Sequence, residues 1–185
     1  MRTRNDWRHI LLTLTYKRHL IFSTTFGDMA ILYQDNPFLM TEILLPRADL
    51  GEIAHKWGKE GYHPNADLVA EVICDYLNGK IIGVPYEWMD MSRLTALQQQ
   101  VLMRVAHIPY GQTRSYKAIA EEIGRPNACR FVGSSVAKNP FPLLIPCHRV
   151  IRSDGGIGQF GGGTEMKQQL LDLESRKAVS VPAGK

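Results

Sequence analysis

Residues 113–137 read TRSYKAIAEEIGRPNACRFVGSSVA and predict two short helices joined by a tight turn. Either Thr113 or Ser115 can cap the first helix, which we expect to end at Glu122. The sequence Gly124-Arg125-Pro126 favours a turn and then a second helix over residues 127–137, because proline suits the first position of a helix. Helix, glycine-containing turn and helix together are typical of a helix-turn-helix motif, although many α-hairpins share the pattern.

The segments around this helix pair are expected to complete a mainly helical C-terminal part. Upstream, four apolar residues recur at the spacing of one helix face, namely Leu94, Leu97, Val101 and Val105. Downstream, the apolar run 143–145 predicts a buried strand, residues 155–163 form a glycine-rich loop, and a last helix covers about 165–174. We expect residues 177–185 to be a disordered tail.

The N-terminal half predicts a mixed α/β arrangement. Short β-rich runs separated by tight breaks indicate an antiparallel meander, and they cover residues 9–16, 19–25, 29–33 and 38–45. Two helices are expected next, over residues 48–57 and 65–77. The following segment, which contains Gly83 and Pro85, has the composition of a linker. We therefore expect an N-terminal domain over residues 1–83 and a C-terminal domain over residues 84–176.

Positive charge is concentrated in one stretch of the chain. The formal net charge is +4 and the sequence pI is about 9.0, a mild indication of a polyanionic partner. Residues 111–152 carry a local charge of +5, from two glutamates and seven basic residues: Arg114, Lys117, Arg125, Arg130, Lys138, Arg149 and Arg152. Charge alone leaves two interpretations open, a solvated basic face and a nucleic-acid-binding face.

Composition and cysteine usage narrow the class of protein. With 185 residues, 44% hydrophobic and 22% charged, the chain can build a core without disulfides or a metal. Its three cysteines, Cys74, Cys129 and Cys147, show no paired spacing, so we expect neither a disulfide framework nor a zinc site. Cys74 fits a buried structural thiol. We expect no signal or membrane segment, and a location in the cytoplasm with the nucleoid, or in the nucleus of a eukaryote.

The residues Ile145-Pro146-Cys147-His148-Arg149-Val150 carry the clearest chemical pattern. A thiol held by a preceding proline and flanked by His148 and Arg149 is a candidate nucleophile, because nearby positive charge lowers a thiol pKa. A Cys–His pair needs a third group to orient the imidazole, and the last helix offers Asp172 or Glu174. Without further information, an inert buried thiol is an equal alternative.

The string Pro146-Cys147-His148-Arg149-Val150 resembles the active-site motif of the O6-alkylguanine-DNA alkyltransferases, also called methylated-DNA–protein-cysteine methyltransferases. Further segments resemble this family in the same order: Ile108 to Gly111 with Thr113, Ser115 and Tyr116, then Arg130 to Gly133 through Asn139-Pro140, then Ser153 to Gly156. The resemblance covers about residues 90–174. Over the first 80 residues it is topological only, because the family carries a divergent α/β domain resembling ribonuclease H.

The resemblance implies a DNA-repair protein that needs no cofactor and no metal. It would transfer an alkyl group from O6-alkylguanine, and also from O4-alkylthymine, to Cys147 in a single turnover that restores the base and inactivates the protein. His148 would take the thiol proton through a bound water, and Glu174 would fix the imidazole tautomer. Tyr116 would donate to a purine ring nitrogen and so make guanine a better leaving group.

The resemblance also assigns the DNA-binding and pocket residues. The second helix of the motif would lie in the minor groove of double-stranded DNA, with Arg130 filling the space of the extruded base. The other DNA-binding residues would be Arg114, Ser115, Lys117, Arg125, Ala128, Ser134, Ser135 and Lys138. Asn139 would brace a hinge, and the pocket wall would comprise Pro142, Val150, Phe160 and Gly161. We expect a monomer that can assemble cooperatively on DNA.

Two departures from the family pattern concern the pocket. The family commonly has tyrosine and then serine where this chain has Phe160 and Gly161. Stacking on a base survives with phenylalanine, while a hydroxyl is lost, so the preference for bulky alkyl groups stays open.

Two other functions remain as alternatives. One is a non-catalytic damage sensor that flips and binds the lesion, and the other is a helix-turn-helix regulator in which Cys147 senses oxidants or alkylating agents. Family members that bind without reacting replace the cysteine, whereas this chain retains Cys147.

Overall fold

The computed structural model describes residues 15–178, without the side chains of the last two. A four-stranded sheet forms the N-terminal part, with β1 (Lys17–Thr24), β2 (Gly27–Asp35) and β3 (Phe38–Leu44) in an antiparallel meander. The short β4 (Lys59–Glu60) pairs in parallel with β1, giving the order β3-β2-β1-β4. The predicted meander is therefore present. The strand predicted at residues 9–16 lies mainly outside the described residues.

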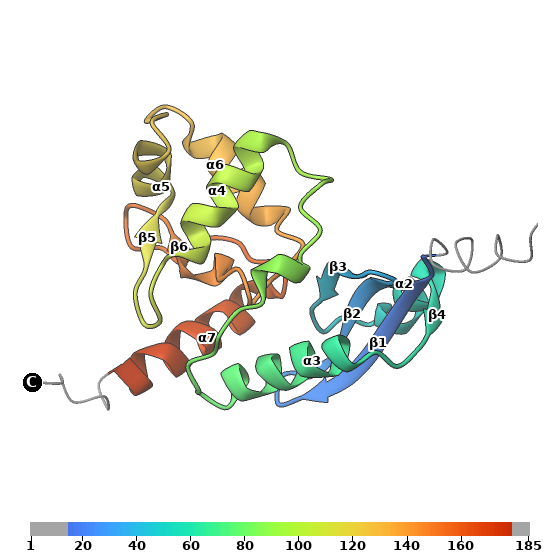
Figure 1. Ribbon diagram of the computed structural model, residues 1–185. Coiled ribbons are helices and arrows are strands. Elements are labelled where there is room, and N and C mark those ends of the chain that lie inside the picture. The colour runs from blue at the N-terminus through green and yellow to red at the C-terminus, as the bar shows by residue number, and fades with distance from the viewer. Residues whose placement is uncertain (1–14, 179–185) are drawn as a thin grey trace, which may run out of the picture.

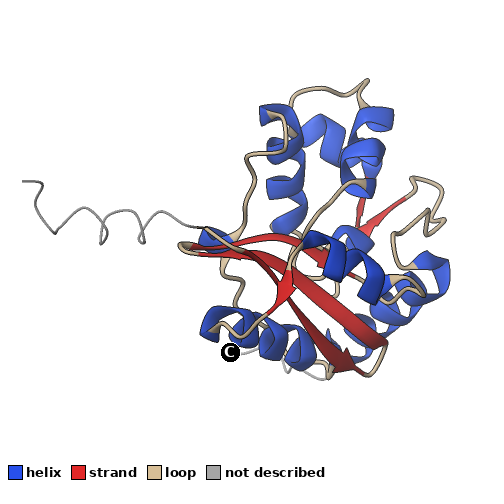
Figure 2. Ribbon diagram, turned by 90° about the vertical axis from the view of Figure 1, so that its right-hand side faces the viewer, coloured by secondary structure: helices blue, strands red, loops and turns tan. Residues whose placement is uncertain are grey.

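Helices cover both faces of this sheet (Figure 2). On one face, α2 (Leu50–Trp57) packs its Leu50 and Ala54 against Ala30, Leu32 and Leu44. On the other face, α3 (Pro64–Leu77) contributes to the main core of the molecule. Because both faces are covered, β2 is buried continuously from Met29 to Tyr33 instead of alternating between core and solvent.

The C-terminal part is mainly helical (Figure 1), comprising η1 (Tyr86–Trp88), α4 (Ala96–Ala106), α5 (Tyr116–Glu122), α6 (Cys129–Ala137), η2 (Cys147–Arg149) and α7 (Gly163–Ala178). Two short strands, β5 (Arg114–Ser115) and β6 (Val150–Ile151), pair in parallel. Ser115 caps α5 by accepting a hydrogen bond from the Ala118 backbone N–H at 3.1 Å, which settles the choice between the two expected caps. The fold is mixed α/β, as the sequence predicted.

Three local predictions were wrong. The run Leu143 to Ile145 is buried but forms no strand beyond an isolated bridge of Ile145 with Pro142, because Leu143 takes a positive φ of 72° that breaks an extended segment. Helix α7 continues past Glu174 to Ala178, into the expected tail, while residues 179–185 lie outside the described residues. Cys74 is half-buried, with its thiol directed at the Ser23 carbonyl at 3.8 Å.

The two halves share one core. A single cluster of buried residues joins both halves. It contains Ile73 and Tyr76 of α3, Val101 of α4, Leu144 from the segment before η2, and Leu170 of α7. The division into domains after residue 83 stays a prediction. In the part of the chain that the structure describes, no helix has both the length and the apolar character needed to cross a membrane.

Candidate active site around Cys147

Cys147 begins the turn η2 and is 5% exposed. The segment leading into it is held by Asn139, whose amide donates to the Ile145 carbonyl at 2.8 Å and whose side-chain oxygen accepts from the Phe141 N–H at 3.0 Å. These two bonds tie the end of α6 to the residues just before the cysteine, a position compatible with the bracing role that the resemblance implies for Asn139. After η2, Val150 pairs with Arg114, which joins the cysteine turn to the start of α5.

His148 and Glu174 form a buried pair, with the imidazole Nε2 2.9 Å from the carboxylate Oε1. Their exposed fractions are 0% and 1%. Burial opposes ionisation of Glu174, but hydrogen bonds from His148 and Arg149 outweigh it and lower the pKa of the carboxyl to about 2. Burial lowers the pKa of His148, although Glu174 acts in the opposite direction. The result is a carboxylate beside a neutral imidazole.

Asp172, the other carboxylate that the sequence offered, does not reach this pair. It accepts a hydrogen bond from the Gln168 side chain at 2.9 Å on the exposed side of α7. The difference follows from helical geometry, since residues two apart lie on different faces.

Arg149 does not act on the thiol as the sequence suggested. Its guanidinium binds both oxygens of Glu174, at 2.8 to 3.0 Å, and donates to the Ile108 carbonyl at 2.6 Å. Burial raises the pKa of Cys147, and the Asn139 side chain and the Lys167 ammonium offset only part of that effect. The expected lowering of the thiol pKa by its two sequence neighbours is therefore wrong, and the thiol needs a base to ionise.

Two residues that sequence reasoning missed complete the cluster. Tyr76, from the last turn of α3, places its hydroxyl 2.6 Å from Glu174 Oε1 and 2.9 Å from His148 Nε2. Lys167 is fully buried and donates to the Val150 carbonyl at 2.7 Å, and burial lowers its pKa to about 8. The spacing of Lys167, Leu170 and Glu174 on one face of α7 could have revealed the lysine.

Cys147 lines two adjoining cavities. The first, of about 460 Å³, is also lined by Tyr116, Gly133 and the loop carrying Gly158, Gln159, Phe160 and Gly161. Burial, and then the nearby cysteine, raise the pKa of Tyr116, so its hydroxyl keeps its proton. Gly158 is required here: its φ is +71°, and a Cβ would lie 3.0 Å from the Tyr116 hydroxyl.

The second cavity, of about 480 Å³, extends from Cys147 to the segment after β3. Pro142, Phe160 and Gly161 line it, together with residues 42–47 and Asp49. A Cβ added at Gly161 would meet only Leu45 Cδ1, at 4.0 Å, so this position leaves open space. Val150 lines neither cavity and is fully buried, which corrects its expected place in the pocket wall.

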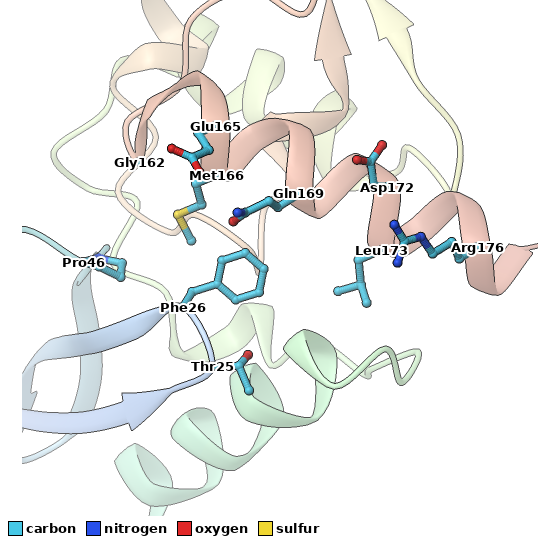
Figure 3. A pocket seen from close by; sticks show the side chains of 10 residues that line it. All are labelled: Thr25, Phe26, Pro46, Gly162, Glu165, Met166, Gln169, Asp172, Leu173 and Arg176. Atoms are coloured by element: carbon cyan, nitrogen blue, oxygen red, sulfur yellow. The ribbon is translucent and has the colours of Figure 1, made fainter.

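A larger cavity, of about 660 Å³, lies between the β1–β2 turn, Pro46 and α7 (Figure 3). Phe26, Met166 and Leu173 line it together with Asp172, whereas Cys147, His148 and Glu174 do not. The largest of these three cavities is thus separate from the candidate active site around Cys147. No group of three or more potential metal ligands occurs within residues 15–178.

Most of the predicted DNA-binding residues lie on the surface of the α5–α6 pair. Six are exposed, namely Arg114, Lys117, Arg125, Arg130, Ser134 and Lys138, while Ser115 and Ala128 are half-buried. Ser135 is wrong as a surface contact, because it is 2% exposed and its hydroxyl donates to the Phe131 carbonyl at 2.9 Å. Arg149 is likewise buried, so the basic stretch contributes less surface charge than its sequence suggests.

Comparison with known proteins agrees with this geometry. Residues 96–176 match the family model described as 6-O-methylguanine DNA methyltransferase, DNA binding domain. The methylated-DNA–protein-cysteine methyltransferase of Mycobacterium leprae is 44% identical over 123 residues, 65% of this chain and 73% of the relative. The inducible enzyme of the same name from Bacillus subtilis is 44% identical over 106 residues, 56% of this chain and 57% of the relative.

Among solved structures, Mycobacterium tuberculosis OGT in complex with DNA superposes with a TM-score of 0.72 and 29% identity. That match covers 86% of this chain and 94% of the other. Sequence motif, site geometry and these similarities agree, and the chain belongs to the methylated-DNA–protein-cysteine methyltransferase family.

Proposed function

We propose that this protein repairs alkylated DNA by moving an alkyl group from O6 of guanine to the sulfur of Cys147, once per protein molecule. The proposal includes O4-alkylthymine, in which the alkyl group is also carried by an exocyclic oxygen. The observation that carries it is the placement of Cys147, which lines two cavities while the next residue is buried against Glu174. The names of the related methyltransferases support the same reaction.

The protonation states of the site support a base-assisted attack. Burial raises the pKa of Cys147, so the resting thiol keeps its proton, whereas the thiolate is the effective nucleophile. His148 is neutral and its buried Nδ1 has no hydrogen-bond partner among the described residues, so that nitrogen can accept the proton. We expect one bound water to carry the proton from Sγ to Nδ1.

The transfer itself is an in-line displacement. Sγ forms a bond to the alkyl carbon while the bond from that carbon to O6 breaks, and the electron pair of the broken bond moves to the purine. The Tyr116 hydroxyl in the first cavity donates to a purine ring nitrogen and so stabilises the departing base. The proton lost by the sulfur balances the one that the guanine gains. Because a thioether is stable, the thiol is not regenerated.

We propose that α5, the turn and α6 form a helix-turn-helix whose second helix enters the minor groove of double-stranded DNA. The exposed Arg130 near the start of α6 would fill the space left by the extruded base. The cavity beside Tyr116 would receive that base. DNA bound to the Mycobacterium tuberculosis relative supports a DNA partner for this chain.

The N-terminal part is proposed to be a ribonuclease-H-like domain ending near residue 83. The support is a three-stranded antiparallel meander that is followed by α2 and by a strand parallel to β1. We further propose a monomer in solution, cooperative assembly on DNA, and a location with the nucleoid or in the nucleus.

The test is a reaction with a duplex oligonucleotide that contains O6-methylguanine. The mass of the intact protein should rise by one methylene equivalent, and peptide mapping should place the increase on the peptide that carries Cys147. The restored guanine should appear in the DNA. Cys147→Ala should bind the duplex without a mass change, whereas Cys74→Ala and Cys129→Ala should react like the wild type. Tight binding with unchanged mass of the wild type would favour the non-catalytic damage sensor instead.

A further inference from the structure

We propose that Tyr76 of α3 is a positioning residue that keeps the lone pair of His148 on Nδ1, where it can accept the proton of Cys147. The proposal rests on the proposed function for its consequence in the reaction. Its geometric basis is independent of DNA, because it concerns three buried side chains from separate parts of the chain.

The hydrogen atoms available to these three side chains decide the tautomer. The Tyr76 hydroxyl lies 2.6 Å from Glu174 Oε1, and an ionised carboxylate can only accept, so the phenol proton is donated there. Between Tyr76 Oη and His148 Nε2, at 2.9 Å, the hydrogen must then come from Nε2. The same holds between Nε2 and Glu174 Oε1, also at 2.9 Å. Nε2 is therefore protonated and faces two acceptors.

Tyr76 remains a phenol throughout, because burial and then the charge of Glu174 raise its pKa far above its usual value. It is 1% exposed, so water does not compete for its hydroxyl. A hydroxyl that both donates to the carboxylate and accepts from the imidazole holds the two groups in one arrangement. Glu174 alone could satisfy Nε2 with its ring rotated, whereas two acceptors restrict the ring plane.

The charges that face His148 determine the direction of the pH effect. Glu174 and Lys167 come from α7, Arg149 and Cys147 from η2, and Tyr76 from α3. Arg149 neutralises Glu174, and the Tyr76 hydrogen bond further satisfies that carboxylate. Both interactions weaken the attraction of Glu174 for a protonated imidazole. Tyr76 also accepts from Nε2, which by itself favours the protonated imidazole, but this acceptor is neutral and the charged Glu174 stays 2.9 Å from Nε2 without it. Removing the Tyr76 hydroxyl should therefore raise the pKa of His148.

The position of Tyr76 also gives the N-terminal part a defined role in the chemistry. Tyr76 lies in the last turn of α3, and its neighbours Ile73 and Leu77 are buried in the core shared by both halves. The packing of α3 on the sheet thus determines where the hydroxyl meets His148. Through this contact, the N-terminal part acts on the proton acceptor of the C-terminal part without touching the substrate.

The decisive experiment compares Tyr76→Phe with wild type in two measurements. The first follows the His148 ring nitrogens by ¹⁵N NMR as a function of pH, in protein that has not been exposed to DNA. Wild type should show the neutral form protonated at Nε2, and Tyr76→Phe should move the His148 titration up by about half a pH unit. The second measures the rate of reaction with free O6-benzylguanine against pH. Its acid limb should move up by the same amount, and its plateau should fall by about fivefold.

Tyr33→Phe is the matched control. Tyr33 is also fully buried in the N-terminal part, and its hydroxyl donates to the Gly61 carbonyl at 2.7 Å. Removing it costs a part-buried hydrogen bond of similar length away from His148, so stability should fall while the His148 titration and the acid limb stay in place. Thermal unfolding of both variants separates stability from pH effects.

Two results would overturn the proposal. One is a wild-type His148 protonated at Nδ1, which requires no variant at all. The other is a Tyr76→Phe protein that folds and titrates like wild type at His148, whatever its rate. If the predicted NMR titration is found but Cys147 is never alkylated, the proposed function fails and the positioning by Tyr76 stands.

Discussion

Two groups of lysines and arginines in the C-terminal part have the same chemistry and opposite surroundings. The surface group on and around α5 and α6 comprises Arg114, Lys117, Arg125, Arg130 and Lys138, all exposed. The buried group comprises Arg149 and Lys167, whose polar hydrogens are bound by Glu174 and by backbone carbonyls. Water and salt screen the first group, whereas only neighbouring protein atoms balance the second. The surface group can act on a partner, and the buried group sets protonation states inside the site.

Arg149→Met should show the largest effect on stability. It leaves the Glu174 carboxylate buried without its cation, so the free energy of unfolding should fall by about 3–5 kcal/mol. Urea denaturation measures this difference. The control Lys56→Met removes an exposed pair with Glu52 and should leave the free energy of unfolding unchanged. Similar losses in both variants would mean that burial does not distinguish the two groups.

Lys167 should make stability depend on pH in the alkaline range. Its pKa is lowered from 10.5 to about 8 in the folded protein, so between these values the unfolded chain binds more protons at this side chain. The free energy of unfolding of wild type should therefore rise with pH, by about 2 kcal/mol relative to Lys167→Met. Denaturation curves on either side of this window test it. Parallel pH profiles of the two proteins would contradict the burial of a charged ammonium.

Arg130→Ala tests a member of the surface group that we propose to act on the extruded base. Repair of a duplex should slow by about tenfold, because the side chain no longer fills the space left in the stack. Reaction with free O6-benzylguanine should be unchanged, since that substrate is already extrahelical. Quench-flow measurements with both substrates give the ratio, and equal losses would argue against the finger role.

Lys117→Ala should have the smallest effect and a purely electrostatic one. Binding of undamaged duplex should weaken slightly at low salt, and the slope of log binding constant against log salt should decrease in magnitude by about one. Lys59→Ala, on the exposed strand β4, should leave that slope unchanged. A slope that Lys117→Ala does not alter would place the DNA on another face.

Local sequence was enough for the elements whose signals lie within a few residues. The meander of β1 to β3 follows from short β-rich runs between breaks. Ser115 caps α5 through a hydrogen bond to Ala118, only three residues away in the sequence. The motif around Cys147 could be recognised because its residues are contiguous in the sequence. Leu143 to Ile145 failed for the opposite reason: an apolar run indicates burial, but it gives no sign of the positive φ at Leu143 that interrupts an extended segment.

Sequence by itself determined the fold class and the surface position of most basic residues, and its contiguous motif singled out Cys147 as the residue that we propose as nucleophile, because periodicity and contiguous motifs are local properties. Tertiary structure decided which groups meet at His148: Tyr76 comes from 72 residues before it and Glu174 from 26 residues after it. It also decided the direction of the Cys147 pKa and the partner of Arg149. These depend on burial and on distances of a few ångströms between remote segments, which only the packed chain defines.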